Sequence, residues 1–335
     1  MPLTQPIVLV TSNKCRTTLL VACSALCCLA AAQSAAQLFP SKVIRIIVPF
    51  PPGGPTDVYA RVIGQKLQES WGQTVIVDNR PGGTGALGSD IVRQSAADGH
   101  TLLFTSNSAH VMGPLLREPR TFDPVKDFTP LSKVIRYPMY ILVNPGVPAR
   151  SIGELIALAK VRPGELNYSS VGTGSGGHLA CELFNVAAGT HIVHVPYKGA
   201  APAQTALVAG EAQVMCDSVG FSQPLVAAGK LRGLAVTGAQ RSAAVPEVPT
   251  LLELGLPVEA YIWLGILGPP GMPAALVSRL NSETVRIMNL PEVRERVIKG
   301  GSEVIANTPE QFSSEMRTES EVWARVIREK GIKSE

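Results

Sequence analysis

The sequence predicts an α/β protein of two lobes, each a mostly parallel sheet flanked by helices, with a cleft between the lobes. Three observations predict this class. Apolar strand-like segments alternate with amphipathic helical segments, and Gly-rich or Pro-rich turns separate them, as in βαβ units. This alternation begins near residue 43 and starts again near residue 137. The chain has 335 residues, 45% of them hydrophobic, which is enough for two ordinary domains.

Residues 1–36 have the pattern of an export signal. Basic residues precede the apolar run Thr17–Ala32, and two small-x-small cleavage sites follow, Ala30–Ala32 and Ser34–Ala36. The run is shorter than the ~20 apolar residues that a transmembrane anchor needs. The segment Leu20–Cys23 resembles a lipoprotein processing site, but only about six apolar residues separate it from the preceding basic residue, so anchoring is less favoured. We therefore expect soluble export to the periplasm.

Charge and composition exclude several other classes. Charged residues make up 17% of a chain with 31 Gly and 27 Pro, which is typical of neither a coiled coil nor a disordered chain. The net charge is +4, and two of the positive charges, Lys14 and Arg16, precede Gln37 in a stretch without acids. The remainder therefore carries +2. Because no block of Lys and Arg is present, we expect no nucleic-acid partner.

The first lobe is expected to open with the strand Val43–Phe50, an apolar run interrupted only by Arg45, as in a parallel strand covered on both faces. Val58, Val62 and Leu67 are spaced as in an amphipathic helix that ends near Gly72. The elements expected after this helix are a strand over 75–77, a turn over 79–85, a helix over 86–95 and a strand over 101–105.

A second series of elements begins with a strand over 137–143. The expected helices of this series are 152–161, 178–188, 203–209 and 223–228, and its further strands are 166–171, 192–195, 212–216 and 234–236. A strand over 260–267 and two amphipathic helices over 274–288 and 311–330, joined by 291–300, close the chain. We infer that the second lobe, 137–261, is inserted in the first, which comprises 37–136 and 262–335.

Two cysteines remain after the predicted signal, which contains Cys15, Cys23, Cys27 and Cys28. Cys181 and Cys216 are free to form one disulfide in an oxidising compartment. Two buried free thiols explain the pattern equally well. Neither cysteine has the spacing of a zinc site.

Two windows, Gly83–Gly88 and Gly172–Gly177, fit the pattern G-x-G-x-x-G. A dinucleotide site also needs an acidic residue at the end of the next strand to bind a ribose hydroxyl. The strand ends that follow these windows carry 105–108 (Thr-Ser-Asn-Ser) and 196–198 (Pro-Tyr-Lys), without a carboxylate. We therefore expect no nucleotide cofactor, and the glycines are first of all turn residues.

The Gly-rich turns share free N–H groups at helix N-termini, which bind anions. They lie beyond the carboxyl ends of strands, where ligands bind in open α/β sheets. Small hydroxyl side chains flank them: Thr56, Thr84, Ser106, Ser108, Ser170, Thr173 and Ser175. Because no GxxxxGK[ST] loop is present, a small carboxylate fits better than a phosphate.

Catalytic and metal signatures are missing from the sequence. There is no G-x-S-x-G or HExxH motif, and the five histidines have no ligand spacing. Asp57 lies at the start of a predicted helix, where capping and ligand contact are equally good explanations. Asp217 follows the strand 212–216 and is harder to explain as a cap. We expect no catalytic residue, metal or cofactor.

Six motifs in order resemble the periplasmic solute receptors of tripartite tricarboxylate transporters, the Bug receptor family. The motifs are 46–57 (IIVPFPPGGPTD) with Ala60 and Arg61, 77–83 (VDNRPGG), 97–103 (ADGHTLL), 168–175 (YSSVGTGS) with His178 and Leu179, 194–199 (HVPYKG) and 268–273 (GPPGMP). The resemblance runs from about Pro40 to the C-terminus. One departure is Thr84, where the family pattern leads us to expect Ala or Gly.

The resemblance implies a two-lobed periplasmic binding protein of type II that closes on a ligand carboxylate. The Pro-Pro-Gly-Gly loop and the Gly-Thr-Gly turn would supply contacts, partly through water. The ligand-binding residues expected from the turns and the resemblance are Phe50, Gly53, Gly54, Thr56, Asp57, Ser106, Ser108, Ser170, Gly172, Thr173, Gly174, Ser175, Tyr197 and Asp217. The expected protein is a monomer that delivers its ligand to integral membrane transporter subunits.

Three functions fit these observations. The leading one is a non-catalytic receptor that captures a small organic carboxylate and delivers it to a membrane transporter. An exported α/β enzyme acting on a small carboxylate would need a nucleophile with an orienting base, which the sequence does not show. A ligand sensor without its own transporter shares every sequence feature with the first. The sequence does not identify the carboxylate.

Overall fold

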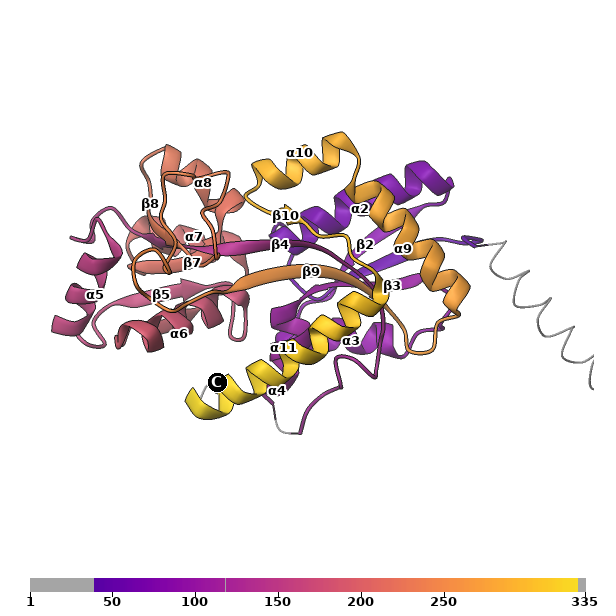
Figure 1. Cartoon of the computed structure of the whole chain (residues 1–335), viewed down its shortest axis with the longest axis horizontal. Coiled ribbons are helices and arrows are strands. Elements are labelled where there is room, and N and C mark those ends of the chain that lie inside the picture. Colours follow the sequence, from indigo (N-terminus) through magenta and orange to yellow (C-terminus); the bar gives the residue numbers. More distant parts are fainter. Residues whose placement is uncertain (1–38, 118, 331–335) are drawn as a thin grey trace, which may run out of the picture.

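The computed structural model describes residues 39–117 and 119–330, so the predicted signal peptide lies outside the described residues. Figure 1 shows an elongated molecule in which two long strands, β4 and β9, run side by side from one lobe into the other. Each lobe is a sheet with helices packed on it, as the sequence predicts. None of the helices in the described ranges combines the length and apolar character needed to cross a membrane.

The sheet of the first lobe contains three parallel strands. They are parallel because a helix connects each strand to the next, as in right-handed βαβ units. The strands are β1 (Ile44–Val48), β2 (Val75–Asn79) and β3 (Thr101–Ser106), and the helices are α2 (Pro55–Trp71) and α3 (Ala86–Arg93). Helix α2 begins with a proline at its first position and ends at Gly72, whose φ of 68° is left-handed. A short helical turn η1 (Gly83–Gly85) precedes α3, and η2 (Ser108–Met112) and α4 (Gly113–Leu115) follow β3.

The strands β4 (Thr129–Val143) and β9 (Tyr261–Gly268) run between the lobes. β4 pairs in the sheets of both lobes, whereas β9 pairs with β3 and β4 in the sheet of the first lobe. β4 pairs antiparallel with β9 as far as Pro138, and from Met139 onward it pairs with β7 and β8 of the second lobe. The change of partner lies next to residue 137, where the sequence predicts the first crossing between lobes. The division into 37–136 plus 262–335 and 137–261 remains a prediction, which this change of partner supports.

The second lobe repeats the arrangement of the first. Its strands are β5 (Asn167–Ser170), β6 (Val193–Pro196), β7 (Val214–Ser218) and β8 (Arg232–Val236), and its helices are α5 (Ile152–Val161), α6 (Gly176–Ala188), α7 (Ala200–Ala209) and α8 (Val219–Ala227). β5 is parallel to β6 and β7, whereas β7 and β8 run antiparallel to β4. Each sheet is thus parallel in its outer part and antiparallel at the crossing strands.

The chain ends in the first lobe, with α9 (Ala274–Met288), α10 (Pro291–Lys299), the short strand β10 (Glu303–Val304) and α11 (Pro309–Lys330). Two expectations needed correction here. Residues 291–299 form a helix rather than a plain connection, and β4 begins at Thr129 rather than at residue 137. The first half of β4 was missed because the polar residues Ser132, Lys133 and Arg136 interrupt its apolar pattern. The strand is nevertheless paired there with β9.

Cys181 and Cys216 form a disulfide, with their Cα atoms 5.8 Å apart, which decides between the two alternatives that the sequence leaves open. The bridge joins α6 to β7 within the core of the second lobe, where both cysteines are buried. It closes a loop of 35 residues and holds the middle of α6 against the middle of β7. Both of these chain segments border the site described next.

Candidate ligand-binding site

An inner cavity of about 80 Å³ lies between the lobes, with room for roughly five to eight water-sized groups. It is bordered by the carboxyl ends of β1, β3 and β7 and by the crossing strands. The predicted positions that line it are Phe50, Gly54, Thr56, Ser106, Ser108, Ser175 and Asp217. An outer cavity of about 490 Å³ adjoins it and shares Phe50 and Ser175 as walls. The remaining walls come from both lobes.

Four helix N-termini reach the inner cavity. The residues Gly54, Ser175, Gly199 and Ser218, which directly precede α2, α6, α7 and α8, all line it. The first N–H groups of a helix have no acceptor within the helix, and the helix dipole makes this end partly positive. Among the described residues, no Lys, Arg or His lines the cavity. Its attraction for an anion therefore comes from N–H groups and hydroxyls.

The hydroxyls of the cavity come from several elements. Ser106 and Ser108, on either side of the end of β3, have their Oγ atoms 2.7 Å apart. Ser218 is 5% exposed, and its Oγ has no hydrogen-bond partner among the described residues. A buried hydroxyl without a partner carries a desolvation cost, which a bound ligand or water would remove.

Asp217 is the one acidic residue among the described residues that line the inner cavity, and its oxygens accept hydrogen bonds from the protein. Oδ1 accepts a hydrogen bond from the N–H of Ser218 at 2.8 Å, and Oδ2 accepts bonds from Ser222 at 2.6 Å and from Gln204 at 2.7 Å. Burial raises the pKa of Asp217, and these hydrogen bonds oppose the rise. Asp217 thus connects α7 with the first turns of α8, which accounts for its place better than a cap does.

The remaining wall is apolar and comes largely from the crossing strands. Tyr137 and Met139 of β4 and Ile262 of β9 line the cavity with Phe50. Burial raises the pKa of the Tyr137 hydroxyl, and the nearby Asp217 adds to the effect. The apolar wall is therefore built by the strands that lead from one lobe to the other.

The turn 172–174 lies at the outer cavity and uses most of its N–H groups internally. Gly172 donates to Ser170 Oγ at 3.1 Å, and Gly174 donates to His178 Nδ1 at 3.0 Å. Ser170 is fully buried and also contacts His194 Nε2 at 2.7 Å, so its hydroxyl shapes the turn.

The loop before α2 also bonds to itself. Asp57 accepts a hydrogen bond from the Gly53 N–H at 3.0 Å and forms an ion pair with Arg61 at 2.8 Å. Burial raises the pKa of Asp57, but the hydrogen bonds from Arg61, Gly53 and Asn79 outweigh it and hold the pKa below its usual value. Of the two explanations that the sequence allows, the contacts favour a structural role at the start of the helix.

The structure thus divides the predicted positions. The outer cavity is lined by Gly172, Thr173 and Gly174. Neither cavity is lined by Gly53, Asp57, Ser170 or Tyr197. Tyr197 packs instead on the core of the second lobe. Residues that sequence reasoning missed in the inner cavity include Gly176, Gly177, Gly199, Ala200 and Ser218. Their signal was present, since each is a small residue within two positions of the start of a helix.

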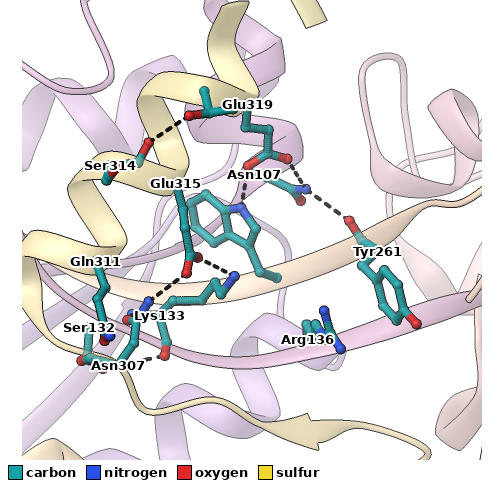
Figure 2. A network of polar contacts seen from close by, with 12 residues as sticks. Asn107, Ser132, Lys133, Arg136, Tyr261, Asn307, Gln311, Ser314, Glu315 and Glu319 are labelled. Carbon is teal, nitrogen blue, oxygen red and sulfur yellow. Dashed lines mark hydrogen bonds and ion pairs between the residues drawn. The ribbon is translucent and has the colours of Figure 1, made fainter. Parts of the chain in front are cut away.

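A polar network connects Asn107 with β9 and α11 (Figure 2). Asn107, which lies between the two cavity serines, donates to the Tyr261 carbonyl at 3.0 Å and to Glu319 Oε1 at 2.7 Å. Glu319 Oε2 accepts a 2.6 Å hydrogen bond from Trp263 Nε1. Burial raises the pKa of Glu319, and the Trp263 and Asn107 hydrogen bonds oppose the rise. Helix α11 is thereby connected to the crossing strand β9 and to the segment that carries Ser106 and Ser108.

Two lobes joined by crossing strands, with a cavity between them bordered by helix N-termini, define a solute-binding protein. The chain belongs to the tripartite tricarboxylate transporter family of receptors, whose family model matches residues 59–332. The members of this family are solute receptors rather than enzymes. They are periplasmic and work with transporter subunits.

Curated relatives and solved structures agree with this membership. The chain is 37% identical to the protein BugT of Bordetella pertussis over 305 residues, which cover 90% of this chain and 94% of BugT. A Rhodopseudomonas palustris protein with adipate is 33% identical, with a TM-score of 0.84 over 88% of this chain and 99% of that one. MatC from Rhodopseudomonas palustris with bound malate is 30% identical, with a TM-score of 0.81 over 86% of this chain and 100% of MatC.

Proposed function

We propose that this receptor binds a small organic carboxylate in the inner cavity and carries it to a membrane transporter. The convergence of four helix N-termini on a cavity whose described walls hold no cation carries the proposal. A carboxylate accepts several N–H and O–H hydrogen bonds at once, and charge-assisted bonds of this kind are strong. The ligand contacts are assigned to the N–H groups of the four helix starts and to the hydroxyls of Thr56, Ser106, Ser108, Ser175 and Ser218.

The size of the cavity favours a compact group. Room for roughly five to eight water-sized groups suits the carboxylate end of a small acid. Two structurally similar proteins are described with adipate and with malate, both of them small carboxylates. These similarities support an organic acid as the ligand.

The route of the ligand is part of the proposal. We assign residues 1–36 to an export signal that sends a soluble, monomeric receptor to the periplasm. There it would take up the acid between two lobes hinged near residues 137 and 261 and present it to the transporter subunits of its family. No nucleic acid has a part in this cycle.

The test uses one position in the cavity with two nearly isosteric substitutions. Ser218 lines the cavity and precedes α8, where Ser, Asn and Asp are all favoured N-cap residues. Ser218→Asp adds a negative charge and Ser218→Asn does not. Calorimetric titration with malate and adipate should show at least a 100-fold weaker affinity for Ser218→Asp than for Ser218→Asn.

A neutral control completes the test. The diamides of the same acids should not bind, because they lack the charge that the helix N-termini attract. Equal binding of acids and amides, or equal affinity of the two Ser218 variants for an acid, would contradict the proposed function.

A further inference from the structure

The outer cavity differs from the inner one in its charge. Two cations line it, Arg117 beyond α4 in the first lobe and Lys198 between β6 and α7 in the second, and no acidic residue lies among its described walls. The inner cavity shows the opposite, with Asp217 and no cation. The two cavities adjoin and share Phe50, Pro51, Val171 and Ser175.

Neither cation has an ion-pair partner in residues 39–117 and 119–330. Arg117 places its guanidinium against Gly83, where a Cβ would lie 3.6 Å from Nη2, and its buried Nε has no hydrogen-bond partner among the described residues. Lys198 is exposed at the rim. Arg241, by contrast, is an exposed cation that pairs with Glu253 at 2.8 Å. Unpaired cations facing one partly enclosed space raise the local concentration of anions.

The rest of the outer wall allows a ligand to come close to the backbone. Gly82, Gly83 and Gly85 have φ values of 135°, 59° and 89°, which a residue with a side chain adopts only at a cost. Thr173 adds a hydroxyl from the second lobe. A ligand group in this space would meet bare backbone, a hydroxyl and two cations, which together suit a second anionic group.

We propose that the outer cavity is a second anion-binding subsite, in which Arg117 and Lys198 hold a distal anionic group, most simply a second carboxylate. This inference rests on the proposed function, because the first carboxylate of the same molecule occupies the inner cavity. The two anionic groups of the ligand are bound by different protein groups: N–H groups bind the first in the inner cavity, and cations bind the second in the outer cavity. Since the cations come from different lobes, the distal group is held by both only when the cleft is closed, which favours the closed state.

The experiment compares acids that differ only in the distal group. The straight-chain dicarboxylates from succinate to suberate are titrated calorimetrically, each beside the monocarboxylate of equal chain length. At the chain length that spans the two cavities, the receptor should prefer the dicarboxylate at least tenfold, as expected for one charge-assisted contact. Arg117→Gln and Lys198→Gln should each reduce this preference at least threefold, and the double variant should abolish it.

Matched controls separate this effect from a change of net charge. Arg162 and Lys230 are exposed cations of the second lobe that line neither cavity, so Arg162→Gln and Lys230→Gln should keep the full preference. Monocarboxylates that bind as tightly as dicarboxylates at every chain length, or an unchanged preference in the double variant, would overturn the subsite and leave the proposed function standing. If neither class binds better than its amide, the proposed function fails, and the subsite fails with it.

Discussion

The methyl group of Thr84 packs directly against Gly174, although the two residues belong to different lobes. A Cβ atom built on Gly174 would lie only 2.5 Å from Thr84 Cγ2, well inside van der Waals contact. Both backbones are in the left-handed region, with φ of 54° at Thr84 and 75° at Gly174. The family motif leads us to expect Ala or Gly at position 84. The methyl group of Thr84 fills the space beside Gly174, where any other residue would place a Cβ atom.

Gly174→Ala should weaken ligand binding at least tenfold, because the added methyl group collides with Thr84 and keeps the lobes apart. Left-handed alanine costs a further ~1 to 2 kcal/mol within the turn. Thr84→Ser removes Cγ2 and keeps the hydroxyl, so the double variant should regain much of the lost affinity. A double-mutant cycle with adipate, read by calorimetry, should give a coupling of about 1 kcal/mol or more. Strictly additive effects would show that the contact has no part in closure.

Loss of the disulfide should destabilise the second lobe. The bridge between Cys181 and Cys216 closes 35 residues, for which the loop-entropy relation gives about 3 to 4 kcal/mol. The free energy of unfolding, measured in urea, should fall by this amount in Cys181→Ala/Cys216→Ala. Reduction of the unaltered protein separates the bridge from the packing of the sulfur atoms. If the reduced protein is as stable as the oxidised one, the bridge contributes nothing.

Stability should fall in mild acid because of two buried histidines. Burial lowers the pKa of His110 to about 4, and burial together with the neighbouring His194 lowers the pKa of His178 to about 3. The unfolded chain takes up these protons below a pH of about 6.5, whereas the folded protein does not. Folding stability is therefore lost as the pH falls from about 6.5 toward 4, by roughly 2 kcal/mol per histidine at pH 5.

The variant His110→Phe tests this dependence, because His110 already packs against Phe122 and Phe128. Its free energy of unfolding should change with pH less steeply than that of the unaltered protein, by about 1.2 kcal/mol per pH unit between pH 6 and 5. His191 is exposed, and His191→Gln should keep the original slope. Parallel slopes for the two variants would refute the assignment.

Glu319→Gln should destabilise the protein by about 1 to 3 kcal/mol, because both oxygens of the carboxylate accept hydrogen bonds, one from Asn107 and the other from Trp263. The NH2 group of the new side chain would face one of the two donors, Trp263 or Asn107, so that one hydrogen bond would be lost. Glu321, two residues along the same helix, is exposed, so Glu321→Gln is the control. Urea denaturation of both variants checks the prediction, and equal stabilities would show that the network in Figure 2 adds nothing to the fold.

Much of the fold could be predicted because its signals are local. The apolar periodicity of 152–161 placed α5 at its observed bounds, and the strand, turn, helix rhythm that restarts near residue 137 predicted two α/β lobes. The motifs from about Pro40 onward predicted the receptor family, which the comparisons confirm. The rule that ligands bind beyond the carboxyl ends of strands directed attention to the correct turns.

Only the tertiary structure decided which rim residues share a cavity. Ser106, Ser108 and Ser170 look alike in sequence, yet two face the inner cavity and the third bonds to His194. Arg117 and Lys198 are 81 positions apart and line one space only because the lobes come together. The physical reason is that hydrogen bonding and apolar periodicity act within one segment, whereas the direction of a turn residue depends on sheet twist and on contacts between distant segments.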